Sequence, residues 1–143
     1  MRAMYLYSVM ADLARHYGDE GLYSACERLW ENMVCKKMYI TGGIGATHFV
    51  EAFSHSYDLP NDTAYAETCA SIGLIFWTRR MLQIKPDSNY ADVMELALYN
   101  TVLSGMALDG KWISLYQEKM DGRRVGLSST AWKRQTMERD CIF

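Results

Sequence analysis

Apolar residues recur every three or four positions along the first part of the chain, which is the period of a helix with one buried face. The pattern predicts one helix over residues 1–17 and a second over about 20–37. Gly18 and Asp19 lie between them, the first a typical helix stop and the second a good N-cap. Because this connection is so short, we expect the two helices to pack as an antiparallel hairpin.

The same period returns in the middle of the chain and predicts a second hairpin. Its first helix, roughly 63–84, would be capped by Asp62 or Thr63. Its second helix, roughly 89–105, is apolar on most sides, so we expect it to be buried. The pattern therefore predicts an all-α fold of paired helices, as in a helical array or an α/α toroid.

Residues 38–62, between the two hairpins, show no sustained helical period. This stretch holds three glycines, one proline and two histidines. Loops of this length are uncommon in compact domains and tend to carry function. We expect a long functional loop here.

Composition narrows the classes of protein that fit. Of the 143 residues, 50% are hydrophobic and 22% are charged, as in a folded domain. A formal net charge of −2 gives no reason to expect nucleic acid or a membrane surface as partner. No apolar run is long enough to span a bilayer, and the N-terminus does not resemble a signal peptide. Four cysteines without a CxxC pair are typical of reduced thiols, so we expect a cytoplasmic protein.

Glu67 and Cys69 form the first candidate site. A carboxylate and a thiolate are both zinc ligands, and the two side chains would meet one ion if they lay in the first turn of a helix. Residues two apart do not otherwise share a helix face. The alternative is structural: Cys69 as a small buried hydrophobe and Glu67 as a partner of the helix dipole.

Two further glutamates attract attention. Glu51 lies in the aromatic-rich loop, where a carboxyl group with a raised pKa would serve as a general acid, or where it is simply solvated. Glu95 interrupts the apolar helix, so it either needs a partner or ligand or points to the one wet face.

Other loop residues have less specific interpretations. His48 and His55 flank Glu51, as metal ligands, hydrogen-bond donors or ordinary loop histidines. Gly42, Gly43 and Gly45 do not match a dinucleotide fingerprint, and a tight turn is the better interpretation.

Three long runs carry a family resemblance. They are KMYITGGIGATHFVEAF, YDLPNDTAYAETCASIGLIFW and PDSNYADVMELALYNTVLSGMALDGK. Together with parts of residues 2–36, they resemble the β-L-arabinofuranosidases of glycoside hydrolase family 127, over about 110 residues. The resemblance implies that the chain is an internal part of a catalytic domain shaped as an (α/α)6 barrel.

The resemblance also implies a reaction, a metal and roles for individual residues. Its members release terminal β-L-arabinofuranosyl residues with retention, using a zinc-bound cysteine thiolate as nucleophile. Matched by motif, Glu67 and Cys69 are two of four zinc ligands, Glu51 is the general acid/base and Glu95 binds the sugar. The expected cofactor is Zn2+, and the expected substrate is an arabinofuranoside-containing glycan.

The chain departs from the family after about residue 112. The family's two other zinc ligands, one of which is the nucleophile, form an adjacent Cys-Cys pair that this chain lacks; Cys141 is the only cysteine after Cys69. Residues 109–143 carry a net charge of +2, whereas the first 108 carry −4. We therefore expect residues 1–112 to be a fragment of the barrel and 113–143 a divergent tail, frame-shifted or disordered.

These departures shape the functional hypothesis. We expect an incomplete zinc site and no hydrolysis by this chain alone. The alternative is a non-enzymatic helical interaction module. Exposed hairpin faces would favour a homo-oligomer or a complementing chain that supplies the rest of the barrel.

Overall fold

A computed structural model describes residues 2–45, 47, 52–61, 64–114 and 116–117 of the chain. Most of the expected tail, 113–143, lies outside the described residues, so the boundary expected at 112 stays a prediction. In chain order the elements are α1 (Arg2–Tyr17), α2 (Glu20–Lys36), β1 (Ala66–Glu67), α3 (Thr68–Ile84), α4 (Ser88–Ala97), the π-helix η2 (Leu98–Val102) and β2 (Tyr116–Gln117).

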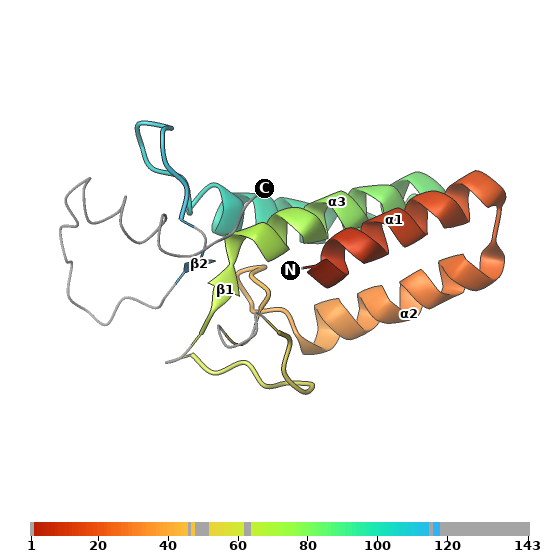
Figure 1. The fold of residues 1–143 in the computed structure, drawn as a ribbon, viewed down its shortest axis with the longest axis horizontal. Helices are drawn as coiled ribbons and strands as arrows, with labels where there is room; N and C mark the ends of the chain where they lie inside the picture. The colour runs from red at the N-terminus through yellow and green to blue at the C-terminus, as the bar shows by residue number, and fades with distance from the viewer. Residues whose placement is uncertain (1, 46, 48–51, 62–63, 115, 118–143) are drawn as a thin grey trace.

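The first hairpin forms as the sequence predicts. Gly18 adopts a positive φ of 64° between the helices, and the Asp19 side chain accepts a hydrogen bond of 2.9 Å from the backbone N–H of Leu22. Helix α1 then packs against both α2 and α3, and α4 packs on α3 (Figure 1). The expected all-α architecture of helical hairpins is confirmed, with one two-stranded sheet added to it.

Helix α3 is the centre of the core. Gly73 lets α1 come close, since a Cβ atom there would lie 2.8 Å from the Cβ of Met4. Trp77 is fully buried, and its ring packs on that of Tyr7 with centroids 4.9 Å apart. The buried residues that α1, α2, α3 and α4 share in this cluster include Met4, Ala11, Cys26, Met33, Ala70, Leu74, Trp77, Met81, Tyr90, Val93 and Ala97.

The third helix begins later than the sequence predicts. It starts at Thr68 rather than near residue 63, and Asp62 and Thr63, the expected caps, lie outside the described residues. Ala66 and Glu67 are extended instead, because they pair antiparallel with Gln117 and Tyr116 of β2. The prediction of a helix at these positions was wrong, since pairing with a segment 50 residues away outweighs local propensity.

The fourth helix also changes character before its expected end at 105. After Ala97 the hydrogen bonds shift to the wider π pattern, with the backbone N–H of Leu103 donating to Leu98 at 2.9 Å. Its burial is one-sided: Tyr90, Val93 and Ala97 are buried, whereas Tyr99 is 60% exposed.

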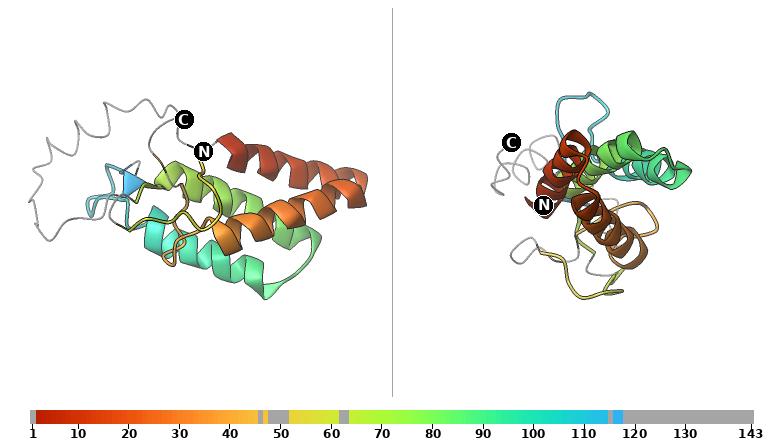
Figure 2. Two further views of the ribbon diagram at one scale, coloured as in Figure 1. Left: turned by 90° about the horizontal axis from the view of Figure 1, so that it is seen from below. Right: turned by 90° about the vertical axis from the view of Figure 1, so that its right-hand side faces the viewer.

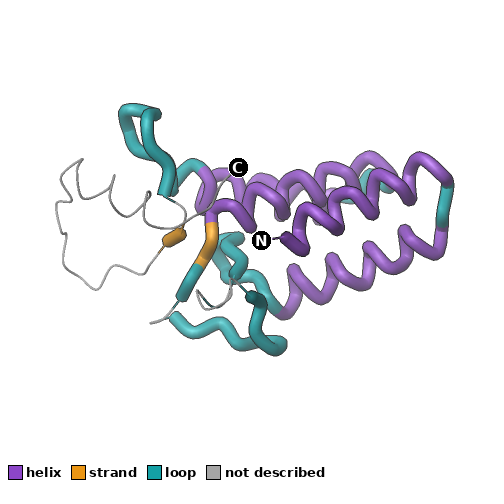
Figure 3. The backbone as a smooth tube through the Cα atoms, in the orientation of Figure 1, coloured by secondary structure: helices purple, strands orange, loops and turns teal. Residues whose placement is uncertain are grey.

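The two strands and the longer loops gather at one end of the helices, and the short turn between α1 and α2 lies at the other (Figures 1 and 3). The end-on view in Figure 2 shows the helices grouped together, with the described parts of the loop between α2 and β1 lying beside them. Among the described residues, no helix has both the length and the apolar character needed to cross a lipid bilayer. Glu67 and Cys69, at the junction of β1 and α3, lie at the end of the helices where the two strands gather.

Candidate functional site

Glu67 and Cys69 lie at the junction where β1 becomes α3. Glu67 is the last strand residue and the N-cap of α3, with extended backbone angles of φ −87° and ψ 123°. Its side chain makes no capping hydrogen bond to the helix, so it does not serve as an ordinary side-chain cap. Each of these two residues is only 1% exposed. The structure therefore places a carboxyl group and a thiol, two residues apart, in a buried strand-to-helix turn.

The donor types at this junction fit zinc, but they form only part of a ligand set. A structural or catalytic zinc site takes three or four protein ligands from cysteine, histidine and carboxylate side chains. Within residues 2–45, 47, 52–61, 64–114 and 116–117, no group of three such side chains could hold a metal ion. Glu67 and Cys69 therefore match at most half of a four-ligand site.

Thr68, between these two residues, adds a polar atom to the junction. Its Oγ1 is buried and has no hydrogen-bond partner among the described residues. Gly105 leaves this hydroxyl room, because a Cβ atom there would lie 3.1 Å from it. A buried hydroxyl in this state costs about 1–3 kcal/mol, so the junction favours the approach of a further polar group.

Glu95 lies on the exposed face of α4, which agrees with the interpretation that it points to the wet side. It lines an open cleft of about 400 Å³ together with Asp92, Leu96, Tyr99 and Asn100. The last two come from η2, which begins three residues after Glu95. Carboxylate, phenol and amide groups that converge on a cleft are suited to bind the hydroxyls of a sugar.

Glu51 and His48 lie outside the described residues. The flanking residues Thr47 and Ala52 form an antiparallel bridge. The expected role of Glu51 as general acid/base is therefore not tested by the structure.

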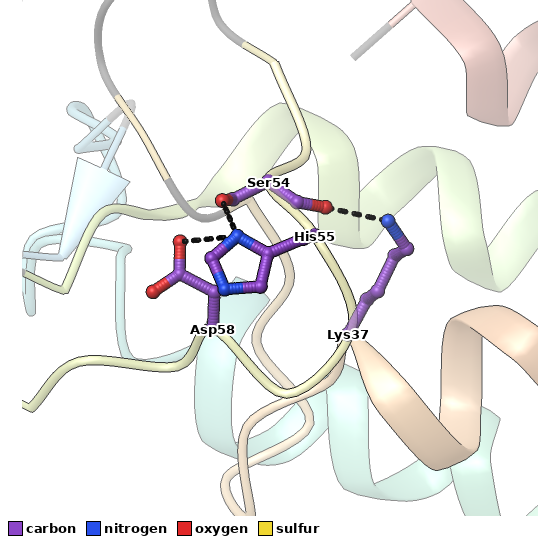
Figure 4. A network of polar contacts seen from close by, with 4 residues as sticks. All are labelled: Lys37, Ser54, His55 and Asp58. Carbon is purple, nitrogen blue, oxygen red and sulfur yellow. Dashed lines mark hydrogen bonds and ion pairs between the residues drawn. The ribbon is translucent and has the colours of Figure 1, made fainter.

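His55 belongs to a small polar network on the loop surface (Figure 4). Its Nδ1 lies 3.2 Å from the Ser54 hydroxyl and 3.9 Å from a carboxylate oxygen of Asp58, and its side chain is 83% exposed. Lys37 donates a 2.6 Å hydrogen bond to the backbone carbonyl of Ser54. This network ties the loop to the end of α2, so the structure favours the interpretation of His55 as an ordinary loop histidine.

Sequence reasoning missed how the glycines of residues 38–45 reach the site. They form the expected tight turn, closed by a bridge between Met38 and Ile44. The carbonyl of Ile44 also accepts a 3.0 Å hydrogen bond from the backbone N–H of Glu67. Three glycines within four positions were the available signal, but their partners are distant in sequence.

The sequence is similar to that of known proteins over most of its length. The family model described as "Beta-L-arabinofuranosidase, GH127 catalytic domain" matches residues 5–141. A non-reducing end β-L-arabinofuranosidase of Bifidobacterium longum subsp. longum is 46% identical over 111 residues, which cover 78% of this chain and 17% of that protein.

Solved structures show the same relationship in three dimensions. Ara127N-Se, a GH127 β-L-arabinofuranosidase from Geobacillus stearothermophilus T6, is 59% identical with a TM-score of 0.79. A second GH127 β-arabinofuranosidase is 47% identical, also with a TM-score of 0.79. Each match covers 82% of this chain and 18% of the solved chain. The described helices are therefore part of a helical-barrel fold, and the chain belongs to the GH127 family of β-L-arabinofuranosidase catalytic domains.

Proposed function

We propose that this chain carries part of the active site of a zinc-dependent, retaining β-L-arabinofuranosidase, and that it is inactive on its own. The observation that carries the proposal is the burial of Glu67 and Cys69 at the β1–α3 junction. The chain spans only 17–18% of the length of the relatives it matches, so the activity belongs to the larger domain.

Glu67 and Cys69 are the residues that would hold the metal. Bound zinc stabilises cysteine thiolates at neutral pH and so supplies an activated sulfur nucleophile. The nucleophile itself belongs to an adjacent Cys-Cys pair, which this sequence does not contain. Cys141, outside the described residues, is the one cysteine after Cys69. This shortfall is the reason to expect weak metal binding and no hydrolysis.

The two other glutamates would act on the sugar. Glu51 would donate a proton to the glycosidic oxygen and then accept one from the incoming water, as in other retaining glycosidases. Glu95 would accept hydrogen bonds from sugar hydroxyls in the cleft that Tyr99 and Asn100 help to line. The substrate class is a glycan with terminal β-L-arabinofuranosyl residues.

A non-enzymatic helical module is the second candidate, and one observation favours it. Along α1, Leu6, Val9, Leu13 and Tyr17 are 58%, 54%, 43% and 75% exposed, at spacings of three and four residues. Such a stripe is typical of a helix that packs against another helix. A protein of this class would associate without binding zinc.

Zinc content separates the two candidates. The purified chain is compared with a chimera in which its aligned segment replaces the matching part of the Geobacillus relative. We expect little zinc and no hydrolysis of p-nitrophenyl β-L-arabinofuranoside by the chain, but stoichiometric zinc and activity in the chimera. Cys69→Ser should abolish zinc binding in the chimera, whereas Cys35→Ser, at an exposed position on α2, should not.

Glu51→Gln in the same chimera tests the acid/base role without removing a proposed metal ligand. We expect zinc to remain bound while hydrolysis falls by at least 100-fold. A folded chimera without zinc or activity would contradict the enzymatic proposal and favour the helical module. Activity of the unmodified chain would contradict its proposed inactivity.

A further inference from the structure

Residues 38–45, named here the glycine hairpin, form a compact turn. It lies between β1, which carries Glu67, and α4, which carries Glu95. Backbone hydrogen bonds close it: the N–H of Tyr39 donates to Gly43 at 2.9 Å, and the N–H of Gly42 donates to Tyr39 at 2.8 Å. Figures 1 and 3 show this turn beside β1 at the loop end of the helices. Gly42, Gly43, Ile44 and Gly45 are all buried.

One side of the glycine hairpin lies directly on the backbone of α4. A Cβ atom on Gly42 would be 2.9 Å from the backbone nitrogen of Ala97 and 3.0 Å from the carbonyl carbon of Leu96. No side chain fits between the two segments at this point. The contact lies one to two residues after Glu95 along α4, at the buried Ala97, whereas the Glu95 side chain lies on the exposed face of the same helix.

The other side of the glycine hairpin lies on β1. A Cβ atom on Gly43 would be 2.9 Å from the Cβ of Ala66, and one on Gly45 would be 3.0 Å from the carbonyl oxygen of Tyr65. The Ile44 carbonyl accepts the 3.0 Å hydrogen bond from the N–H of Glu67, and Ile44 itself is fully buried. The hairpin therefore holds the backbone of a proposed zinc ligand.

We propose that the glycine hairpin is a positioning element that sets the distance between Glu67 on β1 and Glu95 on α4. Its backbone contacts both elements, so the separation between them is fixed by the thickness of the hairpin rather than by adjustable side chains. Gly43 is the positioning residue, because it lies between Ala66 of β1 and Thr101 of η2. Any effect of this distance on zinc and sugar binding rests on the proposed roles of Glu67 and Glu95. The claim that the hairpin sets the distance does not.

Gly43 permits a test in which space is the only variable. It is not among the glycines with a positive φ, so alanine can adopt its backbone conformation. The nearest atom that an added methyl group would meet is the Cβ of Ala66 at 2.9 Å, ahead of Thr101 Cγ2 at 3.3 Å, and Ala66→Gly removes that nearest atom. The double variant Gly43→Ala/Ala66→Gly moves one methyl group across the contact and should restore the spacing.

Hydrogen exchange at the backbone amide of Glu67, measured by NMR, reports on the contact directly. We expect Gly43→Ala to speed this exchange at least tenfold and to leave the amides of Trp77 and Met81 unchanged. The double variant should return the rate to within about twofold of wild type. Ala66→Gly alone and Gly21→Ala, a glycine of α2 that does not contact the site, serve as controls with unchanged rates.

Three results would overturn the proposal: an unchanged Glu67 rate in Gly43→Ala, failure of Ala66→Gly to rescue it, or equal acceleration at Trp77 and Met81. Should Gly43→Ala be insoluble, a soluble double variant with wild-type exchange supports the proposal, and an insoluble one overturns it. Titration with Co2+, followed by thiolate-to-metal absorption, separates the proposed function from this inference. A wild-type chain that takes up no Co2+ counts against the zinc site in this chain, whereas the exchange rates alone decide the role of the hairpin.

Discussion

The helical bundle and the loop end of this molecule are stabilised in different ways. In the bundle, large apolar side chains fill the space between helices, and Trp77, Leu74 and Met81 are fully buried. At the loop end, backbone meets backbone, as where Gly42 lies on Ala97. Side-chain packing tolerates changes of similar volume, whereas a backbone contact tolerates no added atom. The candidate site therefore lies where the structure tolerates the fewest side-chain substitutions.

The largest expected effect is a loss of stability on removing a buried side chain from the helical bundle. Trp77→Ala should lower the free energy of unfolding by about 3–5 kcal/mol, because it leaves a cavity beside Tyr7 in a fully buried position. Urea unfolding followed by circular dichroism measures this loss. The neighbouring Phe76 is 45% exposed, so Phe76→Ala should cost clearly less. Equal losses would show that side-chain burial in α3 does not dominate the bundle.

The next largest effect separates the two regions by comparing alanine substitutions at two glycines with similar φ angles. Gly42 has φ 86° and Gly18 has φ 64°, so alanine at either position pays about 1–2 kcal/mol for the left-handed conformation. Gly18 faces open space, whereas a Cβ on Gly42 would lie 2.9 Å from the backbone of Ala97. We expect Gly42→Ala to cost about 1–3 kcal/mol more than Gly18→Ala in urea unfolding. Equal losses in the free energy of unfolding would mean that α4 moves away freely and that the close contact does not limit the side chain at position 42.

The smallest effect concerns a polar cluster in the bundle. Burial and the hydrogen bond of 2.7 Å to Glu27 raise the pKa of the Tyr23 phenol above its ordinary value of 10.0. Above pH 10, the unfolded chain therefore loses this proton while the folded chain keeps it, and stability falls as the pH rises. Tyr23→Phe should make the loss of stability between pH 8 and pH 11 less steep. Tyr17→Phe, at a position 75% exposed, should leave the slope unchanged.

Local signals in the sequence were sufficient for the helices of the bundle. The Asp19 cap and the Gly18 stop depend only on neighbouring residues, and the structure confirms both. Asp87, one of two expected caps for α4, accepts a hydrogen bond of 3.0 Å from Asn89. The three long runs of the sequence analysis likewise indicated the family, which the comparisons confirm. The roles of Glu51, Glu67, Cys69 and Glu95 stay predictions.

The sequence by itself therefore determined which segments become helices, where the first hairpin turns and to which family the chain belongs, because periodicity, caps and motifs act within a few residues. Only the tertiary structure decided that Glu67 is extended, since its strand pairs with Tyr116 and Gln117. It also decided that the glycine hairpin lies between β1 and α4. These features depend on contacts between segments 20–55 residues apart, and local propensity does not encode such contacts.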